Sequence, residues 1–280
     1  MAKGYALIIG LNRVDKKHYD GWDGKLNVCE NDVIDFAAFL KKKKIAVTSL
    51  LTKNATRSNV LNGLDKLASN AVAGDLVVVF YSGHGGNEIP DLNKDEEDPW
   101  SDKFDESWCL YDAQLIDDEL YFQWKKFKKG VRIIVVSDSC FSGDIVKAIN
   151  DKQRKSKAME TEVGNSTWKK NSITYKAILK QLESKELQLF KSTKIDMVKA
   201  TLLQISSSQE GQPSVPESQW FPNNSLFTGV LLKAFADTKY KSYEHLVSEL
   251  KKIMPDFQTP NEQVLGDKKI KILLQSPFKI

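Results

Sequence analysis

The sequence has few cysteines and little excess charge of either sign, and each shortage excludes a class of protein. Its three cysteines, Cys29, Cys109 and Cys140, lie far apart and form no CxxC pair, which argues against a disulfide framework and a structural zinc site. The formal net charge is only +4, from 41 basic and 37 acidic residues, which is too small to indicate a nucleic-acid partner. We therefore expect a reducing, cytoplasmic setting.

Long apolar runs and nucleotide-binding motifs are also missing. The apolar runs fall well short of the roughly 20 residues that span a membrane, and the first residues, MAKGYALIIGLNRV, contain no signal-peptide core or cleavage site. We expect no membrane partner and no recruitment domain ahead of Tyr5. Neither GxxxxGK[ST] nor GxGxxG follows a predicted strand, and His18 and His245 lack partners at metal-ligand spacing, so a nucleotide-binding protein and a zinc hydrolase are both disfavoured.

What the sequence does contain is an alternation of buried strands and amphipathic helices. Three short runs rich in Val, Ile and Leu, at residues 5–9, 76–81 and 131–137, predict parallel strands buried on both faces. Apolar residues at helical spacing predict helices over residues 31–40 and 58–68, between the first two strands. The alternation predicts an α/β fold, with a mostly parallel central sheet and helices on both faces.

The rest of the chain predicts a connector followed by a smaller region. Residues 151–194 are polar and Lys-rich, with a helical pattern at 175–190. They separate a large catalytic region, 1–150, from a small region, 195–280, and we interpret all three as parts of one domain. Within the small region, the patterns predict strands at 198–205 and 270–274 and helices at 226–236 and 243–253.

Two of the predicted strands end in turns that carry reactive side chains. YSGHGG places His84 after one strand, and SDSCFSG places Cys140 after another. Because the carboxyl ends of parallel strands meet at one edge of a sheet, we expect these side chains to lie close together. An imidazole beside a thiol activates it and can return the proton to a leaving amine, while the backbone N–H groups of Gly85 and Cys140 are available to an oxyanion. Taken singly, each motif also fits a buried cysteine or an ordinary turn.

Together, the two motifs resemble those of the metacaspases and their bacterial relatives, which are caspase-like cysteine peptidases. LNVCENDV is similar to the Cys-x-Asn-Asp segment of that family, residues 91–112 to its acidic loop, and ISSSQEGQPS with SLFTGVLLKAF to the start of its small subunit. The resemblance covers most of the chain. It implies a caspase-like three-layer sandwich of about six strands, and a cysteine endopeptidase with a Cys140–His84 dyad that cleaves after Arg or Lys.

The resemblance also implies a pocket for the basic side chain that precedes the cut. Cys29, Asp32, Ser82 and Asp138 match its positions, and two carboxylates are what a buried cation requires. Taken singly, Asp32 also fits a helix N-cap, Asp138 a turn-stabilising residue and Cys29 a core residue.

Calcium is a further expectation from the family, because many metacaspases are activated by calcium near the substrate cleft. Carboxylates of the acidic loop and beyond are candidate ligands: Asp95, Glu97, Asp98, Asp117 and Asp118. The position of a later acidic ligand falls near Lys147, so a solvated acidic loop remains the alternative. The chemistry itself requires no cofactor.

The Lys-rich connector is where a protease of basic specificity is able to cut itself. The candidate positions are Lys152, Arg154, Lys155, Lys157, Lys169 and Lys170, and a solvated linker is the alternative. The expected partners are protein or peptide substrates with a basic residue before the cut, together with an activating ligand or regulatory protein. A non-enzymatic caspase-like adaptor or ligand sensor is the alternative function, and the intact His and Cys motifs argue against it.

Overall fold

The computed structural model describes residues 1–90, 104–140, 156–191, 198–209, 211–236 and 240–280. The main strands are β1 (Gly4–Gly10), β2 (Ala46–Leu51), β3 (Leu76–Ser82), β7 (Arg132–Asp138), β8 (Thr201–Ser206) and β9 (Asn261–Gly266). They form one six-stranded sheet in the order β2-β1-β3-β7-β8-β9, in which only β9 is antiparallel to its neighbour. The predicted α/β fold with a mostly parallel sheet of about six strands is confirmed.

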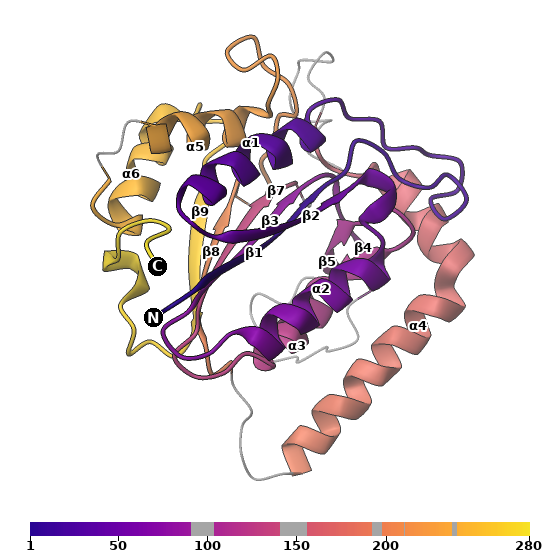
Figure 1. The fold of residues 1–280 in the computed structure, drawn as a ribbon. Helices are drawn as coiled ribbons and strands as arrows, with labels where there is room; N and C mark the ends of the chain where they lie inside the picture. The colour runs from indigo at the N-terminus through magenta and orange to yellow at the C-terminus, as the bar shows by residue number, and fades with distance from the viewer. Residues whose placement is uncertain (91–103, 141–155, 192–197, 210, 237–239) are drawn as a thin grey trace.

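Helices cover both faces of this sheet (Figure 1). One face carries α1 (Cys29–Lys42), α5 (Leu226–Ala236) and α6 (Tyr243–Ile253), and the other carries α2 (Arg57–Asn70) and α3 (Asp117–Lys125). A small antiparallel sheet, made of β4 (Gly85–Pro90), β5 (Phe104–Cys109) and β6 (Gln114–Ile116), lies beside it. The long helix α4 (Thr161–Lys191) packs along β4.

The sheet separates two apolar cores, and β3 shows why its sequence forms a central strand. All seven residues of LVVVFYS are buried. Val78 and Phe80 pack in the core beneath α1 and α5, whereas Val77 and Val79 pack in the core beneath α2 and α3. Because successive side chains of a strand point to opposite faces, a continuous apolar run stabilises both layers at once.

The prediction of a last strand at residues 270–274 is wrong. Residues Ile272–Leu274 form a 3-10 helix, in which the N–H of Leu274 donates to the carbonyl of Lys271 at 3.1 Å. Ile272 is buried while Leu274 is 57% exposed, so the run turns rather than extends. The final strand is instead β9, which is a polar, partly exposed edge strand.

Within the described residues, no helix is both long enough and apolar enough to cross a bilayer. Helix α4 occupies most of the segment 151–194 that we predict as a connector. The boundaries of the large region, the connector and the small region stay a prediction.

Candidate active site

The register of β3 and β7 brings the two predicted turns to the same edge of the sheet. The last residues of these strands, Ser82 and Asp138, are paired, and His84 and Cys140 each follow two residues later. The N–H of Gly83 donates to the carbonyl of Asp138 at 3.4 Å, which joins the turns directly. Both His84 and Cys140 are buried.

The ring of His84 is fixed by groups that the sequence motifs do not contain. Its Nε2 lies 3.2 Å from the carbonyl oxygen of Gly24, and the indole of Trp22 packs against it at 4.7 Å between ring centroids. When Nε2 carries the ring proton and donates a hydrogen bond to the carbonyl of Gly24, Nδ1 is left as an acceptor. Nδ1 is buried and has no hydrogen-bond partner among the described residues.

Burial lowers the pKa of His84 to about 4, because the charged imidazolium is poorly solvated there. The nearby carbonyls of Gly24 and Ala158 oppose this shift, while the positive charge of Lys157 adds to it. His84 is therefore neutral at pH 7 and able to accept a proton.

A lysine of the chain itself fills the predicted substrate pocket. Lys157 is fully buried, and its Nζ donates to Ser82 Oγ at 2.8 Å and to the backbone carbonyl of Asp138 at 3.2 Å. The same Nζ lies 3.1 Å from the carboxylate of Asp138 and 3.5 Å from that of Asp32. Three of the four predicted pocket residues therefore bind one ammonium group.

Cys29, the fourth predicted pocket residue, is also fully buried. Burial raises its pKa to about 12, although the charge of Lys157 and a hydrogen bond with Ser82 partly oppose this. Cys29 therefore remains a neutral thiol. Asp32 lies inside α1, which begins at Cys29, so its alternative interpretation as the helix N-cap is wrong.

The two carboxylates are held by hydroxyl groups from the distant small region. Asp138 accepts hydrogen bonds from Ser214 at 2.8 Å, from Thr228 at 2.6 Å and from Ser225. Asp32 accepts from the N–H of Ser225 at 3.0 Å and lies 2.8 Å from its hydroxyl. Sequence reasoning gave none of these three residues a role, although all three lie in ISSSQEGQPS and SLFTGVLLKAF, the segments that resemble the start of the small subunit.

These contacts separate the pKa values of the two acids. Burial raises the pKa of Asp32, and the charge of Asp138 raises it further, against the opposing effect of Lys157. Burial acts on Asp138 in the same direction, but Lys157 and the hydroxyls of Ser225 and Thr228 outweigh it and lower the pKa overall. Asp138 is the dominant anion of the pocket.

The backbone of Lys157 lies across the two turns. Its carbonyl oxygen accepts hydrogen bonds from the N–H groups of Gly85, at 2.9 Å, and Cys140, at 3.2 Å. These are the two groups that the sequence predicts as oxyanion donors. The N–H of Lys157 donates to the backbone carbonyl of Ser214 at 2.9 Å, and that of Met159 donates to the carbonyl of Gly85 at 2.7 Å. The peptide bond between Lys157 and Ala158 therefore lies at the centre of the site.

The arrangement contains the parts that acyl transfer needs. Cys140 supplies a thiol, which donates to the carbonyl of Gln212 at 3.0 Å, and His84 supplies a neutral base. Two N–H groups already point at one carbonyl oxygen, the geometry that stabilises a tetrahedral oxyanion.

The other predicted autoprocessing positions that the structure describes, Lys169 and Lys170, are not at this site. Lys169 and Lys170 lie within α4, and Lys170 forms an ion pair with Asp20 at 3.5 Å on the surface. Lys152, Arg154 and Lys155 lie outside the described residues. Of the candidates that the structure describes, Lys157 alone contacts the pocket.

The predicted calcium ligands are only partly described. Asp117 and Asp118 form the first turn of α3, where the N–H of Asp118 donates to the carboxylate of Asp117 at 3.0 Å. Asp95, Glu97 and Asp98 lie outside the described residues. In the part of the chain that the structure describes, no three His, Cys, Asp or Glu side chains gather as a metal site. Two carboxylates fall short of the six to eight oxygens that calcium takes, so this site stays a prediction.

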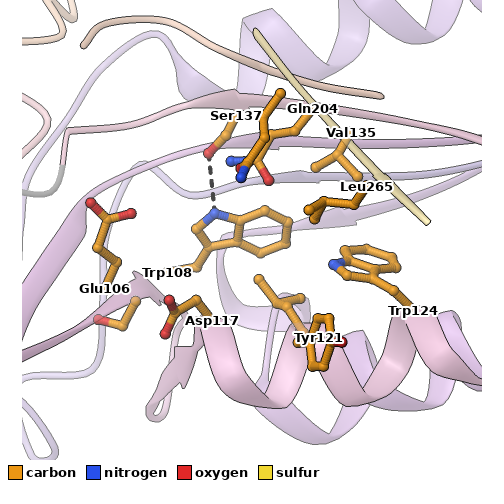
Figure 2. A pocket seen from close by; sticks show the side chains of 12 residues that line it. Glu106, Trp108, Asp117, Tyr121, Trp124, Val135, Ser137, Gln204 and Leu265 are labelled. Carbon is orange, nitrogen blue, oxygen red and sulfur yellow. Dashed lines mark hydrogen bonds between the residues drawn. The ribbon is translucent and has the colours of Figure 1, made fainter. Parts of the chain in front are cut away.

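A separate cavity of about 210 Å³ lies beside the turns that carry His84 and Cys140 (Figure 2). Its lining comprises Glu106, Ser107, Trp108, Asp117, Leu120, Tyr121, Trp124, Val135, Ser137, Gln204, Gln263 and Leu265. The indole of Trp108 donates to Ser137 at 3.1 Å, and Trp108 pairs with Gly85 across β4 and β5. The cavity therefore borders the residues that position both turns.

Known proteins are similar to this chain in sequence and in fold. The family model for the caspase domain, peptidase C14, matches residues 3–275. Metacaspase-1B of Aspergillus fumigatus is 32% identical over 149 residues, which are 49% of this chain and 35% of that protein. Metacaspase-8 of Arabidopsis thaliana is 32% identical over 156 residues, 52% of this chain and 39% of that protein. The chain thus spans little more than a third of the length of these relatives.

A solved structure covers nearly the whole chain. The crystal structure of protein GSU0716 from Geobacter sulfurreducens is 42% identical, covers 99% of both chains and superposes with a TM-score of 0.84.

Proposed function

We propose an activity for this chain from the premise that it belongs to the peptidase C14 family of caspase domains. The family and the metacaspase relatives support a cysteine peptidase. In our proposal the chain is an endopeptidase that hydrolyses protein or peptide bonds after Lys or Arg, with Cys140 as nucleophile and His84 as acid and base.

The observation that carries the proposal is the position of Lys157. Its ammonium group meets Asp138, Asp32 and Ser82, and its carbonyl oxygen meets the N–H groups of Gly85 and Cys140. A basic side chain is therefore bound while the following peptide bond faces the reactive groups. An acidic side chain in this pocket would lie unpaired beside two carboxylates, which is strongly unfavourable.

The geometry supports the following reaction. Neutral His84 takes the proton of the Cys140 thiol, and the thiolate attacks the carbonyl carbon of the basic residue. The oxyanion is stabilised by the N–H groups of Gly85 and Cys140. As the C–N bond breaks, the imidazolium gives its proton to the leaving amine. A water molecule, deprotonated by His84, then attacks the thioester, which releases a carboxylate and restores the thiol.

The first substrate in this proposal is the chain itself. The Lys157–Ala158 bond already occupies the site, so the segment blocks the pocket until it is cut and displaced. Calcium bound by the acidic loop with Asp117 and Asp118 is a further proposed activator. It enters no step of the chemistry above.

The test is hydrolysis of fluorogenic peptides ending in Arg, Lys or Asp, with and without millimolar calcium. The proposal predicts that the wild-type protein cleaves the Arg and Lys peptides, whereas Cys140→Ala and His84→Ala cleave none. Cleavage after Asp, or unchanged activity in Cys140→Ala, would contradict it. A calcium requirement would support the acidic-loop site, and equal rates in EDTA would exclude calcium activation.

A further inference from the structure

The side chain of Met159, two residues after Lys157, lies in an apolar recess. It is completely buried and packs in one cluster with Val14, Tyr19 and Cys109, with Trp22 at its border. Val163 also contacts this cluster, but it belongs to the same connector segment as Met159. The rest of the recess is therefore built by the body of the enzyme.

The backbone fixes which side chain enters the recess. The N–H of Met159 donates to the carbonyl of Gly85 at 2.7 Å, and Ala158 forms a parallel bridge with Gly85. The carbonyl of Lys157 is bound by the N–H of Gly85, so one residue holds the chain on both sides of the Lys157–Ala158 bond. Side chains alternate in an extended chain, so the first and second residues after this bond point in different directions.

The recess adjoins the catalytic histidine. Trp22, at its border, packs on His84, and the N–H of Cys109 donates to the carbonyl of His84 at 2.9 Å. A side chain that fills the recess therefore contacts residues that position the base.

The chemistry of the recess favours an apolar occupant. The hydroxyl of Tyr19 donates to the carbonyl of Leu110 at 2.7 Å, so its proton is directed away from an incoming side chain. Burial raises the pKa of Tyr19, and the charge of Asp112 is a smaller contribution in the same direction. An acidic side chain in this buried, apolar cluster would lose its solvation by water, which is strongly unfavourable.

We propose that this recess is a second specificity subsite, which selects a large apolar side chain two residues after the cleaved bond. Met159 is its occupant in the intact chain, and substrates supply the equivalent residue. The inference rests on the proposed endopeptidase activity. We expect Met over Ala at this position by about tenfold in kcat/KM, as the burial of a Met side chain implies, and Met over Asp by at least about a hundredfold.

The test uses quenched fluorescent peptides with the sequence of residues 156–162, SKAMETE, carrying Met, Ala or Asp at the position of Met159. The wild-type protein is first incubated until its own cleavage is complete. A Lys peptide that ends in a fluorogenic amide has no second residue after the cleaved bond. Its rate of cleavage therefore depends on the pocket and the dyad and not on the recess.

A variant then locates the preference in the recess. Val14→Trp places bulk in the recess, and we expect it to bring the Met-to-Ala ratio close to one. Val72→Trp, at a half-exposed surface position, is the size-matched control and should keep the wild-type ratio.

The outcomes separate the two proposals. If the fluorogenic Lys amide is cleaved and the Met, Ala and Asp peptides are cleaved at equal rates, the subsite proposal is overturned and the peptidase proposal is supported. A preference for Met that Val14→Trp leaves unchanged would also overturn it. Failure to cleave any Lys substrate would overturn the peptidase, and the subsite with it.

Discussion

The ammonium group of Lys157 lies 3.1 Å from the carboxylate of Asp138, and both side chains are completely buried. The two residues belong to different parts of the chain: Asp138 ends β7, and Lys157 precedes α4. A buried ion pair is weak evidence for stability, because desolvation of the charges offsets much of their attraction. In our proposal its value is recognition, since the same contacts are available to any basic residue that enters the pocket.

The first prediction concerns the residue in the pocket. Lys157→Gln removes the cation, so we expect the chain's own cleavage at this position to slow by at least about a thousandfold, because the buried acids are left unpaired. Lys157→Arg keeps the charge and should still be cut. Gel electrophoresis of fresh and incubated protein measures both rates.

Lys169→Gln, at an exposed position in α4, is the matched control and should be cut at the wild-type rate. Equal cleavage of Lys157→Gln and the control would show that the residue in the pocket does not direct the cut.

The second prediction ranks two pocket residues. Asp138→Asn removes the dominant anion, so kcat/KM for a Lys peptide should fall by about a hundredfold or more. Cys29→Ala removes a neutral thiol and should cost less than about tenfold. Steady-state kinetics measures both, with thermal unfolding as the control for folding. A larger loss in Cys29→Ala than in Asp138→Asn would contradict our assignment of the pocket.

The third prediction follows from the pKa of His84, which is about 4 in the folded protein against an ordinary value of 6.5. Between these values the unfolded chain binds a proton that folded His84 does not. The stability due to neutral His84 is therefore complete above about pH 6.5 and is lost as the pH falls toward 4. The loss amounts to roughly 3 kcal/mol.

The measurement compares Cys140→Ala, which our proposal predicts to stay intact, with the double variant Cys140→Ala/His84→Gln. Denaturant unfolding at pH 7.5 and pH 4.5 should show a smaller loss of unfolding free energy in the double variant. Equal losses in the two proteins would mean that His84 titrates normally in the fold.

The fourth prediction concerns Ser225, whose hydroxyl contacts both Asp32 and Asp138. Ser225→Ala removes a donor from a buried anion, so we expect a loss of about 1–3 kcal/mol in unfolding free energy. Ser58→Ala, at an exposed position of α2, should change stability by less than about 0.5 kcal/mol. Chemical unfolding in the Cys140→Ala background measures both, and an unchanged Ser225→Ala would refute the role of this hydroxyl.

The central strands were predictable because a strand that is buried on both faces has a continuous apolar run in its sequence. Residues 76–81 and 131–137 contain continuous apolar runs, and the structure places β3 and β7 there. The edge strands β2 and β9 are partly exposed, so their sequences carry no comparable pattern. The run at 270–274 is apolar for a different reason, because Ile272 enters the core from a turn.

The site was predictable where its residues sit in one motif and unpredictable where distant segments meet. The two turns predict that His84 and Cys140 lie close together, and the family resemblance adds the acids of the pocket, Asp32 and Asp138. From the sequence, six basic residues of the connector are equal candidates for self-cleavage, and only the tertiary arrangement distinguishes Lys157. Likewise Ser214, Ser225 and Thr228 are far from Asp138 in sequence, so their hydrogen bonds to its carboxylate have no local signature.

The most direct test of the account is intact-mass spectrometry of the purified protein before and after incubation, with and without calcium, beside the Cys140→Ala variant. We predict that the wild-type protein yields two fragments, residues 1–157 and 158–280, with Ala158 as the new N-terminus, and that the variant stays whole. Fragments that begin elsewhere, or the same two fragments from Cys140→Ala, would contradict the claim that Lys157 is bound as the enzyme's own substrate.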